Sequence, residues 1–307
     1  MSAGHVVVLT GGIGGAKLVV GLSHVLPPHR LTAIVNTGDD FTHLGLRISP
    51  DMDTLLYTLA GLADPEKGWG RAHETWNFMA ALRAVGGEDW FALGDADLAL
   101  HVERTHRLAA GETLSAIAAR FAERLGVRFT MAPMSDQPVT TCVDTDEGEL
   151  EFQHYFVRRR CAPRLRAVRF ASAQQATVSA SARAALESHG LAAVIIAPSN
   201  PYLSIDPILA VPGMRHAIKV AGVPVVVVNP LPGGHAVKGP AAKIMAELGV
   251  DRSAAAIAAH YHGLATAILL DHADAAVGLA HAFTDTIMGD LPDRIRVARA
   301  ALALAGL

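Results

Sequence analysis

The chain has few cysteines, few aromatic residues and little net charge. Cys142 and Cys161 are its two cysteines, too few for a disulfide framework, so a reduced cytoplasmic protein is expected. Aromatic residues make up 5% of the chain, and a net charge of −3 gives no reason to expect nucleic acid as a partner. The apolar runs are too short to span a bilayer, and no secretory signal is visible at the N-terminus. We therefore expect neither a nucleic acid nor a membrane partner.

What the chain has in abundance is apolar sequence, 51% of its 307 residues, against 18% charged residues. Short β-branched runs predict buried strands at residues 6–9, 31–35, 193–197, 223–228 and 264–270. A helix is predicted at about residues 16–26, between the first two strands, and another at residues 292–304. Strand, helix and strand in this order imply a parallel sheet. The predicted fold is α/β, with a Rossmann-like parallel sheet as its core.

The middle of the chain has a different pattern. It is mostly helical in character, as at residues 112–125, and a β-hairpin is predicted from residues 139–143 and 150–157 around an acidic turn. No linker or internal repeat is visible. We therefore expect one domain over residues 1–307, with a helical and β-hairpin insertion at about 66–160.

A glycine-rich loop follows the first predicted strand. Gly11, Gly12, Gly14 and Gly15 precede Lys17. A dinucleotide-binding loop would carry a third glycine where Lys17 stands, and a Walker A loop would carry glycine directly before its lysine. The loop matches neither pattern, but glycines before a helix N-terminus still favour phosphate binding. A tight turn without a ligand is the alternative.

Ligands of open parallel sheets bind beyond the carboxyl ends of the strands. This rule brings four segments of the sequence to one edge of the sheet: residues 11–15, 36–40, 198–201 and 233–238. Lys238 precedes a predicted helix and offers a second anion site there, with a solvated lysine as the alternative.

Several acidic residues are candidates for metal or substrate binding. Asp53, near the start of a predicted helix, could form a carboxylate pair for Mg²⁺ with Asp39 or Asp40, whereas Asp51 is explained by the helix dipole alone. Gly94–Asp97 supplies a further acidic pair, with an ordinary turn as the alternative. No pattern for a covalent nucleophile is present, and the 15 histidines show no metal-binding spacing.

Taken in order, the motifs resemble the 2-phospho-L-lactate transferase (CofD-type) family. The segments that carry the resemblance are Thr10-Gly-Gly-Ile-Gly-Gly-Ala-Lys17, Val35-Asn-Thr-Gly-Asp-Asp40, Ile48-Ser-Pro-Asp-Met-Asp-Thr54, Leu93-Gly-Asp95 with Asp97, Pro133-Met-Ser-Asp136, Pro198-Ser-Asn-Pro201 and Pro207-Ile-Leu209. The resemblance extends from residue 6 to about residue 250. Ala92, Ala96, Leu100 and Asp206 depart from the residues typical of the family.

The resemblance implies a Mg²⁺-dependent phosphotransferase of coenzyme F420 biosynthesis, acting as a homodimer. Such an enzyme moves a phosphoacid, either 2-phospho-L-lactate, phosphoenolpyruvate or a related acid, from a guanosine diphosphate-linked donor. The acceptor is the ribityl hydroxyl of the deazaflavin 7,8-didemethyl-8-hydroxy-5-deazariboflavin (FO), and GMP is released. The departures leave the identity of the phosphoacid open.

The resemblance also implies roles for individual residues. Asp53 would hold Mg²⁺ or orient the acceptor hydroxyl, assisted by Asp40. The four glycines would hold the diphosphate, and Ser135 and Asp136 would face the deazaflavin. The remaining residues assigned to substrate binding are Lys17, Asn36, Asp95, Ser199, Asn200 and Lys238.

Two other functions are compatible with parts of the sequence. One is a nucleotide-sugar-binding regulatory protein of the same superfamily, which shares the glycine loop but not the Ser-Pro-Asp-x-Asp-Thr segment. The other is a nicotinamide-dependent dehydrogenase, which the spacing of the loop glycines opposes.

Overall fold

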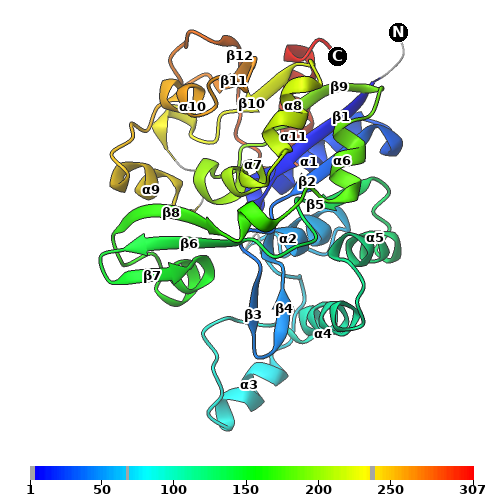
Figure 1. The fold of residues 1–307 in the computed structure, drawn as a ribbon, viewed down its shortest axis with the longest axis vertical. Helices are drawn as coiled ribbons and strands as arrows, with labels where there is room; N and C mark the ends of the chain where they lie inside the picture. Colours follow the sequence, from blue (N-terminus) through cyan, green and yellow to red (C-terminus); the bar gives the residue numbers. More distant parts are fainter. Residues whose placement is uncertain (1–3, 67–68, 236–238) are drawn as a thin grey trace.

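The computed structural model describes residues 4–66, 69–235 and 239–307, and a parallel sheet of seven strands forms its centre (Figure 1). The strand order is β12-β11-β10-β9-β1-β2-β5, and each neighbouring pair is parallel. The strands are β1 (His5–Thr10), β2 (Leu31–Val35), β5 (Thr130–Pro133), β9 (Leu191–Ile196), β10 (Val225–Val228), β11 (Ala267–Asp271) and β12 (Ala280–Thr284). The predicted α/β, Rossmann-like core is confirmed.

Helices cover both faces of this sheet, which explains why its inner strands are apolar throughout. One face is covered by α1 (Gly12–Val25), α2 (Pro50–Leu59), α5 (Leu114–Arg124) and α11 (Leu291–Leu304). The other is covered by α6 (Ala180–Leu186), α7 (Asp206–Ala210), α8 (Met214–Val220), α9 (Ala241–Glu247) and α10 (Ala254–His260). No helix in the described ranges is long and apolar enough to cross a membrane.

The glycine-rich segment is the first turn of α1 rather than a loop before it. Gly11 is the extended N-cap residue, and the helix begins at Gly12, four residues earlier than about residue 16 as predicted. Close packing favours glycine at three of these positions, Gly11, Gly14 and Gly15. A Cβ atom on Gly14 would lie 2.6 Å from the Pro198 carbonyl oxygen, and one on Gly15 would lie 2.6 Å from Ser199 Oγ.

The middle of the chain forms two lobes rather than one continuous insertion. The first contains the hairpin β3 (Phe41–His43) and β4 (Leu46–Ile48) with α3 (Asn77–Ala84) and α4 (Asp95–Ala109) (Figure 1). Strand β5 lies within residues 66–160, the predicted insertion, but it pairs with β2 of the main sheet. The sequence did not indicate this pairing, because β5 is only four residues long and ends in proline.

The second lobe is an antiparallel sheet of three strands in the order β7-β6-β8. The predicted hairpin is present as β6 (Thr140–Thr145) and β7 (Gly148–Glu151). Its second strand is shorter than predicted, because residues 154–158 form a π-helical turn. Strand β8 (Leu165–Ala171) completes this sheet and was not predicted.

Candidate functional site

The candidate site lies where neighbouring strands β9, β1 and β2 end. Two hydrogen bonds join the segments after β1 and β9: Gly11 N–H donates to Ser199 Oγ (3.2 Å), which donates to the Gly11 carbonyl (2.8 Å). Asn36, after β2, donates through Nδ2 to Asp51 (2.9 Å). The structure thus brings together three of the four segments predicted to share this edge.

The fourth segment follows β10, the strand beside β9. There the Gly233 amide donates to Asp274 Oδ1 (2.8 Å), and Asn229 donates to the other oxygen of the same carboxylate (2.7 Å). Lys238, the predicted anion-binding residue of this segment, lies outside the described residues.

Asp51 occupies the N-terminus of α1, where a phosphate was expected. Its Oδ1 accepts from the Gly12 amide (2.7 Å), and its Oδ2 accepts from Asn36. Burial raises the pKa of Asp51 to about 6. The sequence did not reveal this role, because an acid in the first turn of α2 is explained equally well by the dipole of its own helix. A diphosphate at these amides would displace Asp51 or bind beside it.

Asp51 belongs to a cluster of four aspartates, in which Asp39 and Asp53 are buried and Asp40 and Asp51 are partly buried. Burial is the largest effect on each and raises its pKa, to about 7 for Asp40 and well above the ordinary range for Asp39. Repulsion from Asp51 and Asp40 adds to the effect on Asp39. A cluster of this kind favours protons or a cation in its midst.

Asp53 is held by a chain of buried polar side chains. Arg104 Nη2, on α4, forms an ion pair with Asp53 Oδ1, and both residues are no more than 5% exposed. Arg104 Nη1 also donates to His101 Nδ1 (3.3 Å), which assigns the proton of a neutral ring to Nε2. That Nε2 lies 3.1 Å from Asp97 Oδ2, and the Tyr57 hydroxyl donates to Asp97 Oδ1 (2.5 Å). Asp53 therefore has a fixed orientation.

Two oxygens of the cluster fit a hard cation. Asp40 Oδ1 and Asp53 Oδ2 are buried without a hydrogen-bond partner, whereas Ser49 Oγ donates to Asp40 Oδ2 (2.8 Å). The described residues contain no group of three or more His, Cys, Asp or Glu side chains placed to enclose a metal ion. Mg²⁺ needs only one or two carboxylates when substrate phosphates and water complete its coordination, so this donor set suits it.

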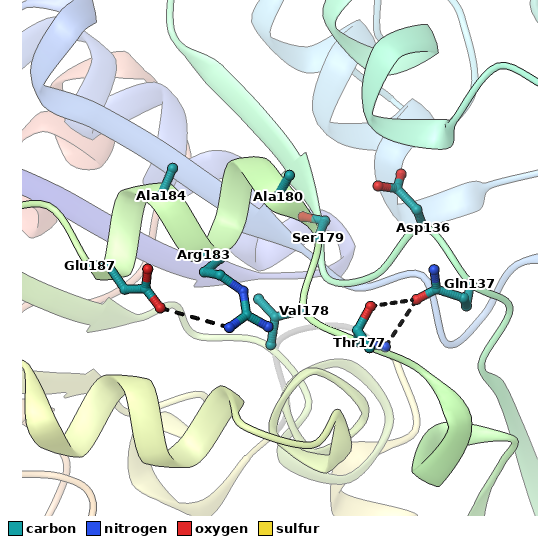
Figure 2. Close-up of a pocket in the computed structure, with 9 residues that line it drawn as sticks. All are labelled: Asp136, Gln137, Thr177, Val178, Ser179, Ala180, Arg183, Ala184 and Glu187. Carbon is teal, nitrogen blue, oxygen red and sulfur yellow. Dashed lines mark hydrogen bonds and ion pairs between the residues drawn. The ribbon is translucent and has the colours of Figure 1, made fainter.

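Two cavities lie near this edge of the sheet, separated by Asp136 and Gln137, which line both. The larger, about 520 Å³, lies along α6 and includes none of the four aspartates (Figure 2). There Gln137 accepts from Thr177, and Arg183 pairs with Glu187 at 3.8 Å. The smaller, about 370 Å³, includes Asp40 and Ser49 in its wall, together with Ser135. Contact with Asp40 makes the smaller cavity the candidate substrate pocket.

Other predicted binding residues serve structural contacts as well. Asp136 Oδ1 accepts from the Ser115 amide (2.7 Å), and Ser135 Oγ donates to Gln137 (3.1 Å). Asn200 Oδ1 accepts from two amides of the following turn, while its Nδ2 is buried without a partner. Lys17 Nζ donates to the Met288 carbonyl (2.6 Å), at the face of α1 that packs near α11.

Asp95 lies at the start of α4 and supports the first turn of α3. Its Oδ2 accepts from the Thr75 hydroxyl (2.6 Å) and from Asn77, and its Oδ1 accepts from the Phe78 amide (2.9 Å). These bonds lower the pKa of Asp95 to about 2. Both oxygens have protein partners, so the described contacts of Asp95 are those of a structural residue.

The fold and the site define a Rossmann-like α/β protein that gathers carboxylates, amides and a substrate-sized pocket at the carboxyl edge of its sheet. The model of the family "2-phospho-L-lactate transferase CofD" matches residues 6–285. The chain belongs to this family, whose members are transferases of coenzyme F420 biosynthesis.

The relatives agree with this assignment. A protein of Streptomyces coelicolor named phosphoenolpyruvate transferase is 43% identical over 315 residues, covering 98% of each chain. A protein of the same name from Mycobacterium avium is 36% identical, covering 98% of this chain and 99% of its own. A crystal structure of a UPF0052 family protein from Bacillus halodurans, 17% identical, has a TM-score of 0.67 and covers 98% of this chain and 99% of its own. That last likeness concerns the fold alone.

Replacing Arg104 tests the buried ion pair. We expect Arg104→Met to lower the free energy of unfolding by about 3–5 kcal/mol, because it leaves Asp53 buried without its counter-ion. Arg169→Met is the matched control: it breaks the exposed pair with Glu149 and should cost less than about 1 kcal/mol. Urea denaturation measures both, and equal effects would contradict the assigned role of Arg104.

Replacing Asp95 tests whether it is structural. We expect Asp95→Asn to be less stable than the parent at neutral pH, because the ionised carboxylate accepts hydrogen bonds from α3. Since folding lowers its pKa from 3.8 to about 2, this stabilisation is lost as the pH falls through that interval. Denaturation midpoints of the two proteins should therefore converge toward acid pH. A constant difference would show that ionisation of Asp95 does not matter.

Proposed function

We propose that this protein transfers enolpyruvyl phosphate from a guanosine diphosphate-linked donor to the terminal ribityl hydroxyl of FO. Family membership supports the transferase chemistry, and the names of the relatives favour phosphoenolpyruvate as the source of the phosphoacid. The observation that carries the proposal is the placement of Asp40. It belongs to the aspartate cluster and also lines the 370 Å³ cavity, so the two parts of the site are continuous.

The proposed reaction is a phosphoryl transfer in which one P–O bond replaces another. The acceptor hydroxyl oxygen bonds to the phosphorus that carries the enolpyruvyl group, and the bond from that phosphorus to the bridging oxygen breaks. The bridging oxygen and its electron pair leave with GMP, and the hydroxyl proton is released. Such a reaction needs positioning and charge neutralisation rather than a covalent enzyme intermediate. This agrees with a site rich in oxygen donors.

The chain's residues divide these tasks between them. The amides at the start of α1 would bind the diphosphate, either beside Asp51 or in its place, while Ser199 fixes Gly11. Asp40, in the pocket wall, would orient the acceptor hydroxyl, while Arg104 keeps Asp53 turned toward the cluster. Asp40 and Asp53 would hold Mg²⁺, which when bound neutralises the charge on the phosphate oxygens.

Product analysis tests this proposal. The purified protein, supplied with Mg²⁺, FO and the guanylylated forms of phosphoenolpyruvate, 2-phospho-L-lactate and phosphoglycerate in competition, should form chiefly the enolpyruvyl phosphodiester together with GMP. Mass spectrometry identifies the products. Preference for another acid would overturn the donor assignment alone. Absence of any phosphodiester would overturn the enzyme assignment and favour the regulatory alternative.

Asp53→Asn tests the placement of the metal. We expect turnover to fall by at least about 100-fold, because the substitution removes a charge that would hold the cation against the phosphates. Asp89→Asn, at an exposed ion pair with Arg83, is the matched control and should keep its turnover. Circular dichroism and thermal unfolding establish that both variants fold. Near-normal turnover of folded Asp53→Asn would remove this residue from the reaction.

A further inference from the structure

The candidate substrate pocket contains a positively charged side chain, Arg47, to which the preceding sections assign no role. Arg47 lies on β4, directly opposite Thr42 on β3, and its side chain lines the 370 Å³ cavity together with Asp40. Among the described residues that line this cavity, Arg47 alone is a lysine, arginine or histidine, whereas Asp40, Asp136 and Glu151 are acids. A negatively charged ligand in this pocket therefore meets one favourable charge in the described part of the wall.

The backbone of Arg47 is fixed from both sides by helix α4. The Arg47 amide donates to Thr105 Oγ1 (2.8 Å), and its carbonyl accepts from Arg104 Nη1 (3.1 Å). Arg104 is also the residue that holds Asp53. Arg104 thus contacts both Arg47 and Asp53, the predicted metal-binding carboxylate. The two residues are therefore held where they can bind neighbouring groups of one ligand.

The guanidinium of Arg47 retains donors for a ligand. Its Nη1 donates to the uncharged Thr42 hydroxyl (3.1 Å), and no ion pair joins it to a carboxylate in the described part of the chain. Arg183 in the larger cavity, by contrast, is paired with Glu187, and Arg104 is buried against Asp53. Arg47 and Asp40 both line the cavity, and the charge of Arg47 partly opposes the rise in the pKa of Asp40 that burial causes.

We propose that Arg47 binds the carboxylate of the phosphoacid group during transfer. This inference rests on the proposed function and deepens it. In phosphoenolpyruvate and 2-phospho-L-lactate the carboxylate is one carbon away from the oxygen bonded to phosphorus, so it lies close to the reacting phosphate. A planar guanidinium with free N–H groups matches a carboxylate with two parallel hydrogen bonds. The acceptor FO has no carboxylate and does not need this contact.

The test compares ligands that differ only in the group Arg47 is proposed to bind. The probes are FO, the enolpyruvyl phosphodiester product and the methyl ester of that product, and deazaflavin fluorescence reports the affinity of each for the full-length protein with Mg²⁺. We expect Arg47→Ala to weaken product binding about 10- to 100-fold and FO binding less than about twofold. The ester should bind the parent more weakly than the product does, and Arg47→Ala should weaken the ester little further.

Two variants complete the design. Arg47→Lys keeps the charge but loses the paired donors, so its affinity for the product should lie between those of the parent and Arg47→Ala. Arg169→Ala, at an exposed arginine outside the pocket, should bind all three probes as the parent does.

Each remaining outcome has a distinct meaning. Equal weakening of FO and product by Arg47→Ala would overturn the proposal, because Arg47 would then support the pocket as a whole. Unchanged product binding would overturn it as well. If the parent protein binds neither FO nor product, the proposed function itself fails, and the role of Arg47 fails with it.

Discussion

The buried ion pair between Arg104 and Asp53 is the interaction on which the site depends. Four aspartates lie where the parallel strands end, and burial raises the pKa of each. Such a cluster is stable only where donors surround it. Arg104 supplies the charge for Asp53, Ser49 donates to Asp40, and the Gly12 amide donates to Asp51. These contacts tie α1, α2 and α4 together at the point where a phosphate compound would bind.

The start of α1 combines a packing role with a binding role. Gly14 and Gly15 allow the helix to lie against Pro198 and Ser199, which no larger residue would permit without a shift. The same close approach places the Gly11 and Gly12 amides at the sheet edge, where they donate to Ser199 and Asp51. The tight turn and the phosphate cradle, alternatives from sequence alone, are therefore compatible: the packing creates the surface on which a diphosphate could bind.

Features that depend on local sequence could be predicted, and features that depend on distant partners could not. The apolar run Val225–Val228 is buried throughout, as an inner parallel strand must be. The four segments that follow strands β1, β2, β9 and β10 lie at one edge of the sheet because these strands are parallel. The sequence did not indicate that Arg104 is buried at the site, because an arginine on an amphipathic helix is usually exposed. Its pairing with Asp53 spans 51 positions. Asp51 was misjudged for a similar reason: its partners are on other elements.

Helix α4 has a consequence for how this architecture can vary. It contacts β4 through Thr105 and Arg104, and it contacts α2 through the same Arg104, so one rigid helix sets the separation between Arg47 and Asp53. The described residues between α2 and α4 supply none of these three hydrogen bonds, but Met79 of α3 and Leu93 are buried against Phe41 and Ile48 of the hairpin. Insertions or deletions at the exposed turn after α3 would leave the spacing of the two charges unchanged, whereas changes within this packed cluster would not. The tip of the first lobe can therefore differ in length while α4 keeps Arg47 and Asp53 at a constant separation.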